Sequence, residues 1–253
     1  MDVQERIAIG FAEADRKRRA NVPGAEVLEI DGLLLAFANV SDPPVNAVHV
    51  LSEPADPVAA FTAAEHAFRE RDRPIGVDVA VGRHPSVDDS IREIGLTRLF
   101  AWPGMAVDVA ELPEAVLPEG IRVEPVTDER GAAAIAHVEQ VGFGSEQEIA
   151  ERFYAASSYP VEGGRSFVAW DGDDPVGMAA GYLHDGAIGI FGVAVVPAAR
   201  RRGIASALSV IAARAFPADL AWLHTDDAHA RSVYERLGFR EVAQWEVWIR
   251  RRA

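Results

Sequence analysis

The residues best suited to chemistry lie between Phe191 and Ser206, in the segment Phe-Gly-Val-Ala-Val-Val-Pro-Ala-Ala-Arg-Arg-Arg-Gly-Ile-Ala-Ser. An apolar run ends at Pro197, a loop with three arginines and a glycine follows, and a helix is expected from about Ala205. The first turn of a helix has backbone N–H groups without an intrahelical partner, at the positive end of its dipole. A diphosphate placed there satisfies several of these donors at once.

The loop residues strengthen this prediction of an anion site. Gly203 lets the backbone approach an anion without a Cβ atom, and Ala205 keeps the start of the helix narrow. The helix dipole contributes only about 0.3–1 kcal/mol. Most of the affinity therefore has to come from the N–H groups and from the three arginines, Arg200, Arg201 and Arg202. The alternative is a surface helix with incidental arginines.

A second patterned segment follows some way along the chain, from Asp227 to Phe239. Ala230, Val233, Tyr234 and Leu237 recur at helical spacing and fall on one face. The glycine that follows Leu237 supplies a stop for this helix.

Together, the two segments resemble signatures of the GCN5-related N-acetyltransferase (GNAT) family. Arg200–Ala205 matches R/Q-x-x-G-x-G/A, directly after a strand and Val-Pro. Asp227–Phe239 matches N-x-x-A-x-x-x-Y-x-x-x-G-F at its alanine, tyrosine, glycine and phenylalanine. The departure is Asp227, where asparagine is usual. Aspartate suits a helix N-cap equally well but repels a nearby phosphate.

The resemblance implies direct transfer of an acetyl group from acetyl-CoA, as co-substrate, to an amine. It places acetyl-CoA in a V-shaped opening where the strand ending at Val196 separates from the strand at Leu220–Thr225, and a strand N–H stabilises the oxyanion. It makes Tyr234 the general acid that protonates the leaving thiolate; the alternative is a tyrosine of the core. The expected cofactor-binding residues are Val193, Ala194 and Val195 (backbone, to the pantetheine arm), Arg200, Arg201, Arg202, Gly203, Ile204, Ala205, Ser206, Asp227 and Ala230.

The general base is not identified by the sequence. Many relatives carry a glutamate on the third strand, but Ala187–Val196 contains no acid. The candidates that could reach the opening are Glu139, Glu162, His184 and Asp226, each of which also suits an ordinary surface or capping position. His224 and His229 belong to no carboxylate–histidine cluster with ligand spacing, so no metal is expected.

The pattern of elements divides the chain into two halves. For the second half it predicts helices at about 127–141 and after Ser145, strands at 165–170, 176–183 and 187–196, a helix at 205–216, a strand at 220–225, a helix at 228–237 and a strand at 242–249. Ser145 and Glu148 have the spacing of a capping box. The short turn His184-Asp185-Gly186 predicts antiparallel neighbours.

The first half repeats this order less clearly. Its predicted elements are a helix at 3–19, a hairpin at 27–40 around Asp31-Gly32, a strand at 45–51, a helix at 57–71, a strand at 75–81, a helix at 86–94 and a strand at 105–109. Ile94-Gly95-Leu96 and Leu237-Gly238-Phe239 each close a helix before a final strand, which predicts an internal duplication. The basic run Arg16-Lys17-Arg18-Arg19 is expected to be the solvated end of the first helix.

These patterns predict an α+β protein of two GNAT-like domains, each a mixed, mostly antiparallel sheet flanked by helices. The expected domains are a degenerate copy at 1–112, a linker rich in proline and acid at 113–120, and a catalytic domain at 121–253. The first copy is expected to lack a pyrophosphate site, because Leu51–Pro57 has two prolines, two acids and neither glycine nor arginine. It would serve packing or form one wall of the acceptor pocket.

Composition limits the partners. The net charge of −14 argues against a nucleic-acid binder. The 253 residues contain no cysteine, which excludes disulfides and thiolate chemistry. No apolar stretch is long enough to cross a membrane, and the N-terminus does not resemble a signal peptide, so a cytoplasmic protein is expected.

The sequence therefore predicts an N-acetyltransferase that acts on an amine of a small molecule or peptide, without nucleic acid or membrane as partner. The alternatives are the same fold using a longer acyl-CoA and a non-catalytic acyl-CoA-binding or sensor module, which the missing strand acid favours. The acceptor, the acyl-chain length, the role of the N-terminal half and the oligomeric state stay open, a homodimer included.

Overall fold

A computed structural model describes residues 1–40, 45–154 and 159–250. The elements of the first half are α1 (Val3–Arg19), β1 (Glu26–Ile30), β2 (Leu33–Phe37), β3 (Ala47–Val50), α2 (Pro57–Glu70), β4 (Gly76–Ala80), α3 (Pro85–Glu93) and β5 (Thr97–Asp108). Those of the second half are β6 (Ile121–Pro125), α4 (Glu129–Phe143), α5 (Gln147–Phe153), β7 (Gly164–Asp171), β8 (Asp174–His184), β9 (Ala187–Val195), α6 (Ile204–Ala213), β10 (Leu220–His224), α7 (Ala228–Arg236) and β11 (Arg240–Ile249). Short 3₁₀ turns lie at Val109–Glu111 and Pro197–Ala199.

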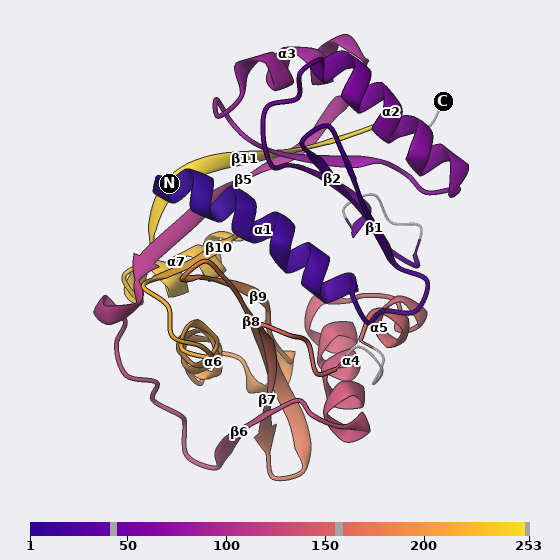
Figure 1. The fold of residues 1–253 in the computed structure, drawn as a ribbon. Helices are drawn as coiled ribbons and strands as arrows, with labels where there is room; N and C mark the ends of the chain where they lie inside the picture. Colours follow the sequence, from indigo (N-terminus) through magenta and orange to yellow (C-terminus); the bar gives the residue numbers. More distant parts are fainter. Residues whose placement is uncertain (41–44, 155–158, 251–253) are drawn as a thin grey trace.

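The described strands form one eleven-stranded sheet in the order β1-β2-β3-β4-β11-β5-β10-β9-β8-β7-β6. Only β3 with β4 and β9 with β10 pair in parallel; all other neighbours are antiparallel. Helices flank both halves of this mixed sheet (Figure 1), in agreement with the predicted α+β class. The division of the chain into domains at residues 113–120 stays a prediction.

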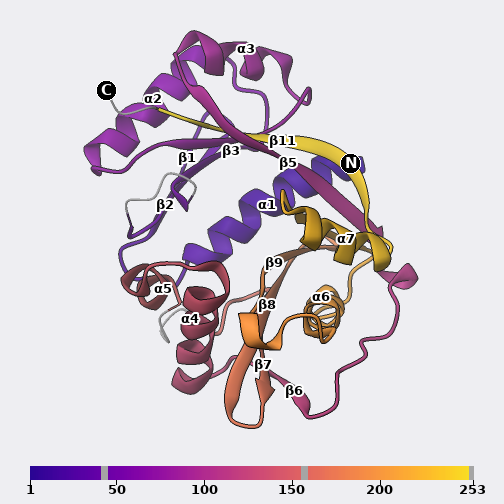
Figure 2. The same cartoon turned by 180° about the vertical axis from the view of Figure 1, so that it is seen from behind.

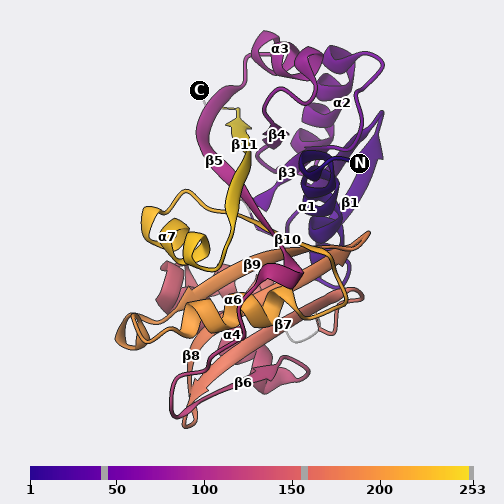
Figure 3. The same cartoon turned by 90° about the vertical axis from the view of Figure 1, so that its left-hand side faces the viewer.

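The two halves exchange their closing strands. β5, the last strand of the first half, pairs with β10 of the second half, and β11 pairs with β4 of the first. β5 and β11 also pair with each other, with Trp102 opposite Trp245, and in Figure 3 they run together between the two halves. Each half therefore completes the sheet of the other.

Helix α1 crosses from one half to the other on a single face of the sheet. Its Phe11 belongs to the same buried cluster as Trp222 of β10 and Trp245 of β11, while Ala12 packs with Leu34 of β2. Helices α4 and α5 lie on one side of β7–β9 and α6 lies on the other (Figures 1 and 2). The residues at the C-terminal end of β9 therefore have α6 on one side and α1, α4 and α5 on the other.

Local turn chemistry fixes the element boundaries that the sequence predicted best. Asp31-Gly32 and Asp185-Gly186 all have positive φ, which suits tight hairpin turns. Gly95 ends α3 with φ 80° and Gly238 follows α7 with φ 96°. The two glycines close their helices with the same hydrogen bonds, which supports the predicted duplication.

Some expectations were wrong. β6 was missed because it is short and ends in proline, and β5 begins eight residues before its predicted start, ahead of Pro103 and Gly104. Ser145 does not cap α5: the N-cap is Glu146, without a side-chain bond, and the Ser145 hydroxyl donates to Glu139. Among the described residues, no helix has the length and apolar character needed to span a membrane.

Candidate functional site

The parallel strands β9 and β10 separate partway along their length. They pair from Ala187 to Gly189 on β9 and from Leu220 to Trp222 on β10, and no pairing follows. At Gly192, where φ is 59°, β9 has a bulge: two residues of β9 lie opposite the single residue Ala179 of β8. Such a bulge bends the strand. The separation agrees with the predicted V-shaped opening, and the backbone of Val193 faces it without a partner in β10.

Beyond the opening, the N-terminus of α6 is formed by two residues in left-handed conformations. Arg201 has φ 64° and Gly203, the N-cap, has φ 90°. No side chain caps this helix, and no described group accepts a hydrogen bond from the N–H groups of Ile204, Ala205 and Ser206. Successive N–H groups in such a turn form a concavity that binds anions. This part of the chain fits a diphosphate.

The three arginines of the loop have different surroundings. Arg200 donates to the backbone carbonyls of Val195 and Gly142, 3.0 and 2.9 Å away, so it ties the loop to β9 and α4. Arg202 forms an ion pair with Asp171 at 2.6 Å. Arg201 is exposed and makes no described hydrogen bond or ion pair. Of the three side chains, only that of Arg201 has no described protein partner that would compete with an anion at the helix terminus.

Helix α7 brings the second motif beside this loop. Asp227 is its N-cap, and its carboxylate accepts a 2.7 Å hydrogen bond from the N–H of Ala230. That bond lowers the pKa of Asp227. Slight burial opposes this effect, and His229 and Arg200 add to it. The expected capping role is confirmed, and the carboxylate stays ionised, so it disfavours phosphate at this end of α7.

Tyr234 lies on the buried face of α7, 7% exposed, with its ring packed edge-on against Phe239. Burial raises its pKa to about 12, against a smaller lowering by a hydrogen bond with Ser209 of α6. Ser209 in turn donates to the carbonyl of Ala205 in the first turn of α6. The phenol is therefore protonated at neutral pH and lies one helical turn from the anion concavity.

Of the four candidate bases, Glu139 is the one with a described hydrogen bond to a side chain beside the bulge of β9. Its carboxylate accepts hydrogen bonds from Ser145 at 2.8 Å and from the Tyr154 hydroxyl at 3.2 Å. That hydroxyl is 4.0 Å from the position a Cβ would take on Gly192, at the bulge. Of the other three, His184 ends β8 at the closed hairpin, Glu162 is exposed beside Lys17, and Asp226 is exposed shortly after the end of β10.

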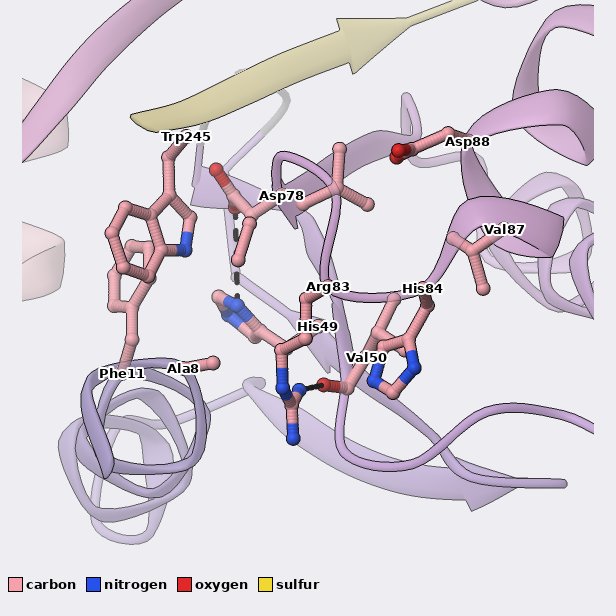
Figure 4. Close-up of a pocket in the computed structure, with 12 residues that line it drawn as sticks. Ala8, Phe11, His49, Val50, Asp78, Arg83, His84, Val87, Asp88 and Trp245 are labelled. Atoms are coloured by element: carbon pink, nitrogen blue, oxygen red, sulfur yellow. Dashed lines mark hydrogen bonds and ion pairs between the residues drawn. The ribbon is translucent and has the colours of Figure 1, made fainter. Parts of the chain in front are cut away.

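The first half contains a matching separation of parallel strands, and it is filled. β3 and β4 pair from Ala47 to His49 and from Gly76 to Asp78, then diverge. Arg83 enters the gap and donates to the carbonyls of Val50 and Leu51 (Figure 4). The remaining cavity of about 10 Å³ has room for about one water molecule.

The other parts of a cofactor site are also missing from the first half. Asp56 caps α2 through a 3.0 Å bond from the N–H of Ala59, and Pro57 removes a further donor. The hydrogen bonds around Gly95 and Gly238 place Ile91 of α3 at the position that Tyr234 has in α7. These residues fit the predicted degenerate copy.

The basic run at the end of α1 was predicted wrongly as a solvated surface. Arg19 is 3% exposed and pairs with the buried Asp15, which also binds His49 of β3 at 2.9 Å. Figure 4 shows His49 directed toward Asp78, 4.0 Å away. Both halves of the protein cover helix α1. The sequence pattern of the helix does not reveal this, because basic residues are common at the C-terminal end of solvent-exposed helices.

Comparison with known proteins agrees with this fold. Residues 132–239 match the model of the Acetyltransferase (GNAT) family. No curated protein matches the sequence.

Solved structures share the fold of the whole chain. A GCN5-related N-acetyltransferase from Kribbella flavida superposes with a TM-score of 0.77 at 20% identity, over 100% of this chain and 97% of that one. A functionally unknown conserved protein from Staphylococcus epidermidis gives 0.67 at 14% identity, over 92% and 96%. A tandem GNAT protein from the clavulanic acid biosynthesis pathway gives 0.64 at 16% identity, over 94% and 86%.

Proposed function

We propose that the C-terminal half, in which residues 132–239 match the GNAT family model, moves an acetyl group directly from acetyl-CoA to an amine of a small molecule or peptide. The observation that carries this proposal is the uncapped N-terminus of α6, with Arg201 and Gly203 in left-handed conformations, beside the separated strands β9 and β10. It supplies donors for the pyrophosphate and an edge of β9 for the pantetheine arm.

The reaction follows from these positions. The free amine attacks the thioester carbonyl, the N–C bond forms, and an N–H of β9 stabilises the oxyanion that develops. The C–S bond then breaks, the thiolate receives a proton from Tyr234, and the nitrogen loses its extra proton to a base or to water. Tyr234 suits its role because its hydroxyl is protonated at neutral pH and lies beside α6. The cofactor residues named from the sequence keep their roles in this proposal with three exceptions. The Arg200 side chain supports the loop, Arg202 pairs with Asp171, and the Asp227 carboxylate caps α7.

A non-catalytic acyl-CoA-binding role is the second candidate, because β9 carries no acid. The two are separated by measuring CoA release from acetyl-CoA over a panel of primary amines, with product identified by mass spectrometry. Amine-dependent CoA release supports the transferase. Tight acetyl-CoA binding without release over the whole panel would leave only the binding role.

A further inference from the structure

The face of β9 that lies opposite α6 carries a polar cluster that the cofactor site does not use. Phe191 forms its floor, and its ring contacts Tyr182 of β8 at 5.5 Å and Phe11 of α1 at 6.0 Å. Arg18 from α1 stands over this floor, and Glu139 from α4 interacts with Arg18 electrostatically and with the Tyr154 hydroxyl by a hydrogen bond. The cluster, which we call the β9 face cluster, consists of Arg18, Glu139, Tyr154, Tyr182 and Phe191. It lies next to the bulge where the thioester is expected.

Glu139 is a half-buried carboxylate with a fixed orientation. Two hydroxyls, those of Ser145 and Tyr154, donate to its two oxygens. Burial raises the pKa of Tyr154 well above its usual value, so this phenol remains a donor to the carboxylate. A carboxylate held in this way presents its remaining lone pairs as acceptors for an ammonium group.

Arg18 brings a positive charge from the N-terminal half to the same place. Its guanidinium carbon lies 5.3 Å from the centre of the Phe191 ring. Burial alone would lower its pKa, but Asp15, the hydroxyls of Tyr182 and Tyr154, and Glu139 outweigh burial and raise it. Arg18 therefore stays charged within the range of Glu139.

The charge of Arg18 is only partly neutralised by Asp15. Asp15 pairs at 2.9 Å with both Arg19 and His49, and at 3.3 Å with Arg18. The Arg18 side chain is 20% exposed, compared with 2% for Arg19. Arg19 therefore belongs to the buried ionic cluster, whereas Arg18 extends toward the second half.

We propose that the amine acceptor binds on the β9 face cluster and that it is a zwitterion, an amine that also carries a carboxylate. The ammonium meets Glu139 and loses a proton before the free amine attacks, the carboxylate meets Arg18, and an apolar side chain lies beside the half-buried ring of Phe191. This inference rests on the proposed acetyl transfer and deepens it: the N-terminal half, which has lost its own cofactor site, supplies the residue that selects the acceptor.

The test compares two acceptors that differ only in the carboxylate, phenylalanine and 2-phenylethylamine. We expect kcat/KM for phenylalanine to exceed that for 2-phenylethylamine by at least about tenfold, the worth of one charge-assisted pair. 3-Phenylpropionate, which keeps the carboxylate and lacks the amine, should inhibit competitively against phenylalanine. Equal use of both amines, or a preference for 2-phenylethylamine, would overturn the inference and leave acetyl transfer intact.

Variants assign the recognition to Arg18. Arg18→Met should raise KM for phenylalanine by about 10- to 100-fold, with kcat, KM for 2-phenylethylamine and acetyl-CoA affinity unchanged, and Arg18→Lys should restore part of the loss. Arg98→Met is the control, because this arginine is 58% exposed and pairs with Glu246 far from the cluster. An equal loss for both acceptors in Arg18→Met contradicts the assignment.

A binding measurement keeps the inference testable without turnover. Calorimetry of phenylalanine with the full chain in the presence of CoA should show binding that Glu139→Gln weakens and that 2-phenylethylamine does not reproduce. If no amine is acetylated but this binding is seen, the acceptor site stands and the proposed function fails. If amines are acetylated and phenylalanine shows no binding, the acceptor site fails alone.

Discussion

Tyr234 is the residue on which the proposed chemistry depends most directly. Changing it to phenylalanine removes one hydroxyl and keeps the packing against Phe239, so folding and acetyl-CoA affinity should hardly change. If the hydroxyl protonates the thiolate, kcat should fall by about 10²–10⁴. The loss should shrink for acyl donors with a more acidic leaving thiol. A wild-type kcat in this variant, with chemistry rate-limiting, would reduce Tyr234 to a packing residue.

The buried acid Asp78 should make stability depend on pH. The pKa of Asp78 is raised to about 7, mainly by burial. The charge of Asp15 also raises this pKa, whereas the charges of His49 and Arg19 lower it. In the unfolded chain the pKa is about 3.9. The folded protein therefore holds more protons between about pH 4 and 7, and the contribution of Asp78 to stability is lost as pH rises through that window.

Asp78→Asn removes this titration. The free energy of unfolding of both proteins is measured with urea. We expect the difference, variant minus wild type, to be more positive at pH 8 than at pH 5. Asp15 does not interfere, because its partners hold its pKa far below the usual range and its own effect appears only in stronger acid. A difference between variant and wild type that is the same at both pH values would contradict the assignment.

At the scale of elements, the N-terminus of α6 is the proposed site of cofactor binding. Gly203 has φ 90° and open space where a Cβ would point, so a valine there meets no steric clash but a backbone conformation it rarely adopts. Gly203→Val should abolish acetyl-CoA binding, measured by calorimetry, and the strained backbone should cost about 1–3 kcal/mol of stability.

A matched control separates strain from position. Gly82 also has positive φ, 76°, and open space around its Cβ position, but it lies in the first half. Gly82→Val should cost similar stability and leave acetyl-CoA affinity unchanged. Equal affinities in Gly203→Val and wild type would remove the α6 terminus from the site.

At the scale of the whole molecule, the second half depends on a strand of the first. β5 lies between β10 and β11, so a chain of residues 113–253 would leave both strands with exposed edges. We expect this fragment to be insoluble or to lack cooperative unfolding, and co-expression with residues 1–112 to restore a soluble complex. A stable, cooperatively folded fragment would show that the exchange of β5 and β11 is dispensable.

One chain should bind one acetyl-CoA. In the first half Arg83 fills the gap between β3 and β4, and Asp56 caps α2 with a negative charge where α6 has a bare terminus. Calorimetric titration of the full chain should saturate near one cofactor per chain. A value of two would show that the N-terminal half retains a site.

The sequence by itself determined the local geometry of the proposed cofactor site. Arg200–Ser206 and Asp227–Phe239 are continuous segments, so residue spacing alone places an N-terminal turn, a cap and one helical face. The positive-φ turns at Asp31-Gly32 and Asp185-Gly186 are likewise local. These features depend on near neighbours in the chain, and the structure contains them where the spacing predicts them.

The proposed acceptor site rests only on the tertiary structure. The apolar pattern of β5 predicts a strand but not its partner, because alternation fixes which face is buried and not which edge is paired. Exchange of β5 and β11 brings α1 across both halves, so Arg18 reaches Phe191 while Arg19 is buried with Asp15. Residues so far apart in the chain meet only because one continuous sheet buries its apolar faces, and no local spacing records that contact.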